Sequence, residues 1–193
     1  MALFEFNTEV PAQFAAATMG INADLLRPEL ETHQIPAPEK IAPNALAFST
    51  HKPNPAETPN NRAAGRIVFL HDPEEFETWG SNMRVIAYGK SPLETDVADQ
   101  GDYAQYWWGT LELALKTLGA KYINGAGTIT KMISTGVGSI EGEPVHSEVE
   151  LRASWSPTED DLAPHFAAWQ NLIAEMAGFH VGGEDVVKIE NAS

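Results

Sequence analysis

Residues 144–157, PVHSEVELRASWSP, constrain the fold more than any other stretch of the sequence. Their apolar side chains fall at odd positions, namely Val145, Val149, Leu151, Ala153 and Trp155. Their polar side chains fall at even positions, namely His146, Glu148, Glu150, Arg152 and Ser154. This alternation predicts a β-strand with one buried face and one exposed face. A shift by one residue would expose the whole apolar set, so we expect a fixed register.

The other patterns predict an α+β domain with the element order α-β-β-β-α-β-β-α. Helical spacing predicts a helix within residues 1–27, a second beginning at Tyr103 and ending at Gly119, and a third over residues 161–177. Residues rich in strand-forming side chains predict strands over 44–50, 65–70, 83–88 and 122–133, besides the strand already described. Because hairpins are antiparallel, we expect an antiparallel sheet of about five strands with helices on one face.

The chain is predicted to be one domain with an irregular connection near its start. Residues 1–27 form the N-terminal helix, and residues 28–61 form a Pro-rich connection with at most one strand, because they hold seven of the thirteen prolines. Residues 62–180 form the α+β core. In the tail, residues 181–193, three apolar residues could add an edge strand: Val186, Val187 and Ile189.

A short helical turn is predicted between the strands at 65–70 and 83–88. Its terminal residues are Asp72 as N-cap, Pro73 at the first position, Glu75 as capping-box partner and Gly80 as terminator. We expect Phe76 and Trp79, three residues apart, to pack the turn against the body of the protein. This helix-start chemistry also accounts for most of the ligand-type side chains that follow His71.

Composition narrows the classes of function. The net charge of −15 counts against nucleic acids and anionic membrane surfaces as partners. The absence of cysteine excludes disulfides and fits a reducing compartment, so we expect a cytoplasmic protein. The six histidines show no metal-ligand spacing, and neither a metal nor a cofactor is predicted. The Gly125-Ala126-Gly127 segment lies within a predicted strand, where Trp107 or Trp108 could fill the space that glycine leaves.

Cations on four predicted strands form the candidate site. They are Arg66, Arg84, Lys131 and Arg152. If these side chains share the exposed sheet face with His146, Glu148 and Glu150, they form either a cross-strand lattice of salt bridges or a site for an anion. Glu148 and Glu150, about 7 Å apart on one strand face, also have a separation that suits paired-carboxylate chemistry, but a solvated strand face is the simpler explanation.

Several motifs resemble those of an uncharacterised actinobacterial family, the domain-of-unknown-function family number three thousand. The motifs are Gly65-Arg66 with Leu70-His71-Asp72-Pro73, Gly127-Thr128-Ile129-Thr130, and Glu150-Leu151-Arg152-Ala153-Ser154-Trp155-Ser156-Pro157. The resemblance covers about residues 27–178 and implies no activity, cofactor or catalytic residue. The element order is also similar to that of type III secretion chaperones, which are small acidic domains that bind partner proteins, but this is an analogy of topology alone.

Two functions therefore remain open. The first is a non-catalytic cytoplasmic module that binds another protein, or a second copy of itself, through the open sheet face or a helix. The second is a small-molecule (anion) binding protein or enzyme with a pocket at the strand ends, lined by Arg66, His71, Glu150 and Arg152. A deep cavity with three or more convergent polar groups would favour the second.

Overall fold

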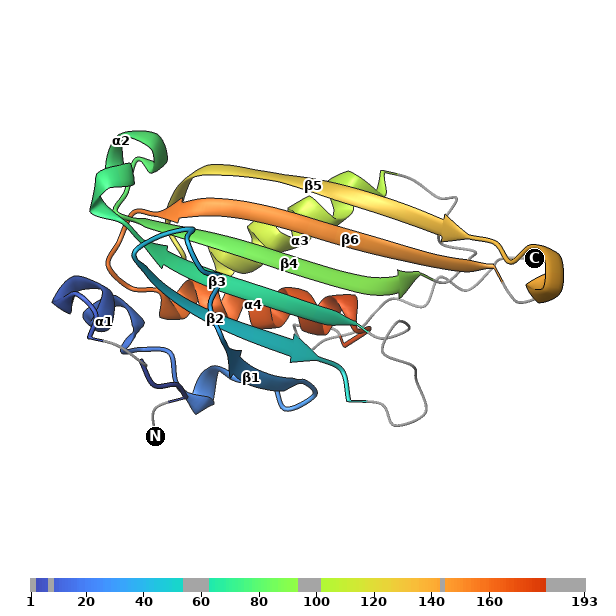
Figure 1. Cartoon of the computed structure of the whole chain (residues 1–193), viewed down its shortest axis with the longest axis horizontal. Helices are drawn as coiled ribbons and strands as arrows, with labels where there is room; N and C mark the ends of the chain where they lie inside the picture. Colours follow the sequence, from blue (N-terminus) through green and yellow to red (C-terminus); the bar gives the residue numbers. More distant parts are fainter. Residues whose placement is uncertain (1–2, 7–8, 54–62, 94–101, 143–144, 180–193) are drawn as a thin grey trace.

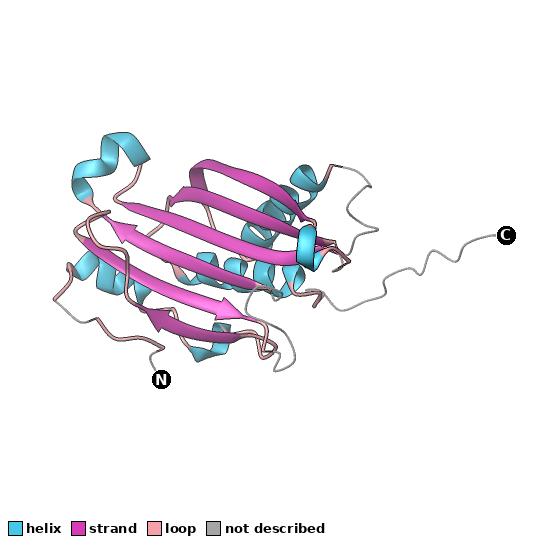
Figure 2. Cartoon of the chain, turned by 45° about the vertical axis from the view of Figure 1, so that its right-hand side comes forward, coloured by secondary structure: helices cyan, strands magenta, loops and turns pink. Residues whose placement is uncertain are grey.

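The computed structural model describes residues 3–6, 9–53, 63–93, 102–142 and 145–179. One antiparallel sheet with the strand order β1-β2-β3-β4-β6-β5 forms one layer, and helices α3 and α4 form a second layer on one face of it (Figure 1, Figure 2). The strands are β1 (Glu31–Ile35), β2 (Asn44–His51), β3 (Ala64–His71), β4 (Met83–Leu93), β5 (Tyr122–Ser134) and β6 (His146–Pro157). The helices are α1 (Ala12–Thr18), α2 (Phe76–Trp79), α3 (Tyr103–Thr117) and α4 (Ala163–Met176). The predicted α+β class is thus confirmed.

Strand β6 has the two faces that its alternating sequence predicts. Val149, Leu151 and Trp155 are at most 1% exposed and face the helices. The even-numbered side chains from His146 to Ser154 lie on the opposite, helix-free face. Val145 is the exception, with 43% of its surface exposed, because it precedes the first residue of the strand. Since β6 lies between β4 and β5, its apolar side chains form the middle of the core.

Helix α4 buries the stripe that its spacing predicts. The stripe residues are Leu162, Phe166, Trp169, Ile173 and Met176, all buried in the core between sheet and helices. Pro164 lies in the first turn, where a missing N–H costs no helical hydrogen bond. The glycines expected at helix ends, Gly80, Gly119 and Gly178, have φ angles of 71°, 72° and 84°.

The N-terminal helix is shorter than the pattern predicts. Phe14, Ala17 and Ile21 are buried as expected, but α1 ends at Thr18 and a separate 3-10 turn follows at Ala23–Leu25. Gly20 lies so close to the start of α4 that a Cβ atom there would be 2.9 Å from the Cβ atom of Ala163. The chain turns here because contact with α4 requires a glycine at this point, and continuing the helix would break that contact.

The sheet has one strand more than the predicted five. Strand β1 lies in the Pro-rich connection and pairs with β2 through Ile35, directly before Pro36. The hydroxyl groups of Thr32 and Thr50 are 2.7 Å apart across this pair. Proline ends a strand but permits five paired residues before it, so the proline count understated the strand content. The tail strand predicted for residues 186–189 lies outside the described residues.

The turn between β3 and β4 begins with the predicted cap but uses a different second contact. The Asp72 carboxylate accepts a hydrogen bond from the Glu74 N–H at 3.0 Å. The Asp72 N–H, which a capping-box side chain would satisfy, donates instead to the Asn82 carbonyl at 2.9 Å. Trp79 packs on a small cluster on the helix-free face, built on Ala47, Val68 and Leu70. Phe76 is 51% exposed, so the prediction that it packs against the body was wrong.

Alanine substitutions at Gly127 and Gly109 are expected to change the free energy of unfolding in opposite directions. A Cβ atom at Gly127 would lie 2.5 Å from the Arg152 carbonyl oxygen and 2.7 Å from the Trp108 ring, so Trp108 fills this space as the sequence suggested. We expect Gly127→Ala to cost about 1–3 kcal/mol of unfolding free energy, because backbone cannot move away cheaply. Gly109, inside α3, has open space around it, and we expect Gly109→Ala to add about 0.5–1 kcal/mol. Urea titration of both variants measures the two changes in unfolding free energy, and changes of the same sign would contradict the prediction.

Candidate functional site

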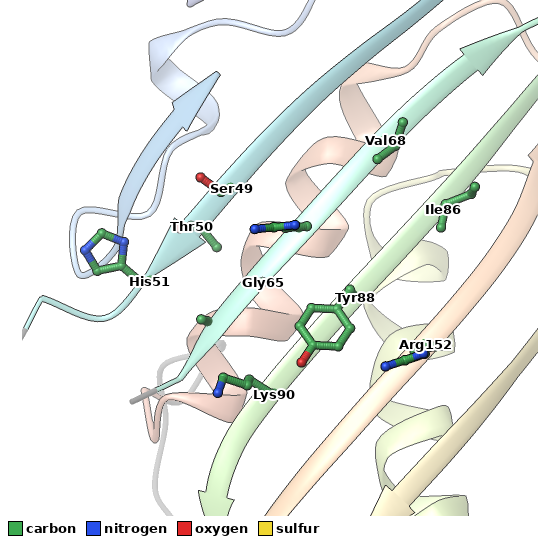
Figure 3. A pocket seen from close by; sticks show the side chains of 11 residues that line it. Ser49, Thr50, His51, Gly65, Val68, Ile86, Tyr88, Lys90 and Arg152 are labelled. Carbon is green, nitrogen blue, oxygen red and sulfur yellow. The ribbon is translucent and has the colours of Figure 1, made fainter. Parts of the chain in front are cut away.

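The helix-free face of the sheet is hollowed into a groove of about 700 Å³ that crosses strands β2, β3, β4 and β6 (Figure 3). Besides the buried Thr50, six polar residues line it, namely Ser49, His51, Arg66, Tyr88, Lys90 and Arg152. The remaining lining residues are small or apolar, and none of the described lining residues is Asp or Glu. We call these six polar residues the basic groove. In a chain with 27 acidic and 12 basic residues, this lining stands out, while the neighbouring acidic side chains, Glu31, Glu148 and Glu150, contact three of its basic members from beside the groove.

Strand register aligns the middle of the basic groove. Ser49 pairs with Arg66, Arg66 with Tyr88, and Tyr88 with Arg152, so four neighbouring strands each contribute one side chain to a single row. Strands are about 4.8 Å apart, which separates the Cα atoms of Arg66 and Arg152 by about 10 Å. The Tyr88 ring lies between them, and the Arg152 guanidinium is 5.8 Å from its centroid.

The next row along the sheet provides the other cation and the open space. His51 pairs with Ala64, Ala64 with Lys90, and Lys90 with Glu150. Because Ala64 has only a methyl side chain, the surface above the sheet is lower at Ala64 than at the longer side chains of His51 and Lys90 on either side. This low point contributes to the hollow that Figure 3 shows between His51, Tyr88 and Lys90.

Glu150 holds one side of the groove in place. It accepts a hydrogen bond from the Tyr88 hydroxyl at 3.0 Å and one from the Arg152 Nε at 2.6 Å. Burial, followed by the hydrogen bond to Glu150, raises the pKa of Tyr88 to about 12. Tyr88 therefore keeps its proton at neutral pH and serves as a hydrogen-bond donor rather than as a base.

Contacts with carboxylates at the margin account for three further side chains. The Lys90 Nζ is 3.6 Å from Glu148, and the His146 Nε2 is 4.0 Å from the same carboxylate. The His51 Nε2 is 3.2 Å from Glu31. Each of these groups is partly exposed, so each pair is worth about 0–1 kcal/mol.

Arg66 differs from the other cations of the groove. It is exposed on β3, and it makes no hydrogen bond or ion pair with any of the described residues. An arginine has five N–H donors in a planar fork that matches carboxylate and phosphate groups. Among the described residues, therefore, no group occupies the donors of Arg66, whereas Lys90 and Arg152 each contact a carboxylate.

The structure brings together only some of the residues that the sequence singled out. Arg66, Glu150 and Arg152 lie together at the basic groove, and His146 lies beyond it beside Glu148. Salt bridges and a candidate anion site thus lie side by side on this face, since Glu148 and Glu150 pair with cations, while Arg66 pairs with no acidic group in the part of the chain that the structure describes.

Three other predicted site residues lie elsewhere. Arg84 is on the helix-free face but near the opposite strand ends, where it donates to the Ser154 and Ser156 hydroxyls at 2.6 and 2.9 Å. Burial lowers the pKa of Arg84.

Lys131 lies on the opposite face of the sheet. It pairs in register with Val149, so it faces the helices, and its Nζ is 5.9 Å from the Tyr103 ring centroid.

His71 also lies away from the groove, on the buried face of β3. It is 1% exposed and stacks on Phe14 with 5.6 Å between ring centroids. Burial lowers its pKa. The pocket predicted between Arg66, Arg152 and His71 therefore does not form, because side chains five residues apart on one strand point to opposite faces.

Sequence reasoning missed Tyr88, Lys90, His51 and Ser49 as groove residues. The predicted strand ended at residue 88, whereas β4 continues to Leu93. The signal was present, because Arg84, Tyr88 and Lys90 share the parity of the exposed face, and small residues, Ala87 and Gly89, alternate with the last two. Extending the strand by parity would have included Lys90.

Two other kinds of site, a catalytic carboxylate pair and a metal centre, are less well supported than an anion site. Glu148 and Glu150 lie on one strand face as expected, yet each has its own cationic neighbour, which explains both carboxylates without a substrate. Among the described residues, no group of three or more His, Asp or Glu side chains is placed to hold a metal ion. None of the described helices is both long enough and apolar enough to cross a membrane.

Comparison with known proteins identifies a family but no activity. Searches of curated proteins and of solved structures found no significant match, so the analogy with type III secretion chaperones stays a prediction. The family model described as protein of unknown function (DUF3000) matches residues 10–183. The match confirms the resemblance seen in the sequence motifs and extends it toward the N-terminus to include α1. Because the match spans most of its 193 residues, the chain belongs to the DUF3000 family.

Proposed function

We propose that this protein is a non-catalytic binding module that holds an acidic segment of another protein in the basic groove. The observation that carries the proposal is Arg66, an exposed arginine without a partner among the described residues. The described lining of its groove includes two further cations, Lys90 and Arg152, and no acidic residue. On a chain of net charge −15, a basic hollow directs acidic ligands to one place.

The form of the groove favours an extended segment as its ligand. The groove is open and crosses four strands, and its floor alternates polar rows with the apolar side chains of Val68 and Ile86. Tyrosine and arginine are enriched where proteins bind one another, because they offer large contact area together with hydrogen-bond donors. Tyr88, held by Glu150 and flanked by Arg152, is rigid enough to act as such an anchor.

A non-catalytic role is supported by the condition of the titratable groups. Glu150, Glu148 and Tyr88 are engaged with one another or with cations. The pKa of Tyr88, about 12, is far above the neutral range in which a general base or acid works best.

Two further properties are part of the proposal. The absence of cysteine supports a cytoplasmic location. The family resemblance supports an actinobacterial origin.

A small anion is the second candidate ligand. It is favoured by the groove volume of about 700 Å³, which falls in the range typical of small-molecule pockets, about 300–1,000 Å³. Arg66 could bind a phosphate or carboxylate group bidentately, with the Tyr88 row beneath it. This candidate shares Arg66 with the first and differs in the size of the ligand.

The first prediction on the groove concerns charge reversal at Arg66. Twelve-residue peptides are selected by display for binding to the wild-type protein, and we expect acidic residues to be enriched among them. Arg66→Glu should weaken binding of a selected peptide about tenfold or more, because one opposite-charge contact becomes a like-charge contact. Fluorescence anisotropy of the labelled peptide measures the change.

The control is Lys116→Glu, which makes the same change in net charge on an exposed position of α3. We expect it to leave the affinity within about twofold, since it lies on the other side of the sheet and is screened by salt. Equal losses in the two variants, or selected peptides without acidic residues, would contradict the proposal. Saturable micromolar binding of inorganic phosphate or citrate that Arg66→Glu abolishes would favour the second candidate.

A further inference from the structure

The two edges of the sheet are protected very differently. Strand β1 forms one edge with five residues, among them Glu31 and His33, and ends at Pro36. Strand β5 forms the other edge with thirteen residues (Figure 1). Proteins usually protect an edge by shortness, charge or proline, because its free N–H and C=O groups otherwise pair with another chain. Strand β1 has all three protections.

Strand β5 has few of these protections. Its sequence, YINGAGTITKMIS, contains no Asp, Glu or Pro, and Lys131 is its single charged residue. Lys131 points toward the helix layer and leaves uncharged side chains on the helix-free face, namely Ala126, Thr128, Thr130, Met132 and Ser134. Met132 is 39% exposed and Ile133 is 62% exposed.

One end of β5 is irregular and covered, and the rest of this edge pairs with no strand among the described residues. The register with β6 shifts between Ile123 and Ala126. The Asn124 side chain donates to the Trp79 carbonyl at 2.9 Å, so the turn after α2 covers this end. The regular part of the edge therefore runs over residues 126–134, and its midpoint is Thr130.

We propose that β5 pairs antiparallel with β5 of a second copy of this chain, around a two-fold axis that passes through Thr130. The axis is perpendicular to the sheet, so the two sheets join into one and the helices of both copies lie on the same side. The pairing leaves both basic grooves open, since they lie over β2, β3, β4 and β6, and it does not depend on what the groove binds.

The distribution of charge makes β5 the place where two copies of this chain can approach each other. Two molecules of net charge −15 repel each other over most of their surfaces, and β5 is a long stretch without any acidic residue. A second copy also brings a preformed strand of equal length, which costs less ordering entropy than an unfolded peptide would.

The side chains also suit the register centred on Thr130. Thr130 of one copy then lies opposite Thr130 of the other, and Thr128 lies opposite Met132, which are favourable uncharged pairs. On the other face Lys131 lies opposite Ile129. A register centred on Lys131 would place two lysines directly opposite each other, and that arrangement is destabilising.

The mass in solution tests the pairing. We expect sedimentation velocity at about 50 µM to give twice the mass of the 21.0 kDa chain. Thr130→Lys should shift the protein to the monomer or weaken dimerisation at least tenfold, while the far-UV spectrum and melting temperature show that the fold is kept. The matched control His33→Lys places the same side chain on the exposed face of β1 and should leave the dimer intact. A monomeric wild type, or a dimer that withstands Thr130→Lys, would overturn the proposal.

Crosslinking tests the register separately. Since the chain has no cysteine, Thr130→Cys introduces a single thiol. Opposed residues in an antiparallel pair have Cα atoms about 4.5–5.5 Å apart, within the range of a disulfide. We expect mild oxidation to give a covalent dimer for Thr130→Cys and not for His33→Cys. A dimer that forms without this crosslink, or equally with both, would contradict pairing at Thr130.

Discussion

Replacing Trp155 by alanine is expected to lower the free energy of unfolding by about 3–5 kcal/mol. Trp155 is 1% exposed in the middle of the core, opposite Val85 on β4. Its ring lies 6.4 Å from that of Tyr122, and its Nε1 donates a hydrogen bond to the His165 Nδ1 at 2.9 Å. The variant therefore loses packing and also leaves a buried acceptor on His165 unsatisfied.

Glu148→Ala, on the helix-free face of the same strand, is the comparison. It removes a partly exposed ion pair with Lys90, and we expect a loss of less than about 1 kcal/mol. Urea titration gives both values. Trp155→Phe keeps most of the ring but not the N–H, so it should fall between the two variants. Similar small losses for Trp155→Ala and Glu148→Ala would mean that the faces of β6 are reversed.

The second large effect is a loss of stability in acid that comes from His165. Burial lowers the pKa of His165 from 6.5 to about 4. The hydrogen bond from Trp155 requires an unprotonated Nδ1, which favours the same neutral form. The unfolded chain takes up a proton on this histidine below about pH 6.5, whereas the folded protein does so only near pH 4. The unfolded state thus binds more protons in this window, and stability falls as the pH falls through it.

The expected size of this loss is up to about 3 kcal/mol between pH 6.5 and pH 4. His165→Gln provides an acceptor for Trp155 without a titrating ring, so it should flatten the profile of unfolding free energy against pH in this window. His71, whose pKa is also lowered by burial, is present in both proteins and cancels in the difference. Parallel profiles for wild type and His165→Gln, measured by urea titration at several pH values, would show that His165 does not cause the loss.

Local sequence patterns were sufficient where one face or stripe of an element is buried. The parity of β6 and the stripe of α4 come from burial against the same core, and both patterns predicted the buried residues. The patterns were insufficient where a contact from elsewhere decides the local structure. Gly20, which ends α1 against Ala163, and β1, which is held by pairing with β2, are examples.

The groove could be predicted only in part because it depends on register between strands. Parity within one strand says which residues share a face but not which face of the sheet that is. Lys131 and Arg152 show the difference, since the pairing of Lys131 with Val149 turns it toward the helices. Arg66 and Arg152 lie in one row because Tyr88 pairs with both of them.

The strand order has a consequence for the kinetics of folding. Every pairing in the sheet joins strands that are consecutive along the chain, except that of β4 with β6, which brings Val85 beside Trp155. The meander β1–β4 and the hairpin β5–β6 can each form from local contacts, but joining them requires closing a long loop before any core contact compensates its entropy. We therefore expect the rate-limiting step to be the docking of these two units, and Trp155, at their seam, to become buried in that step.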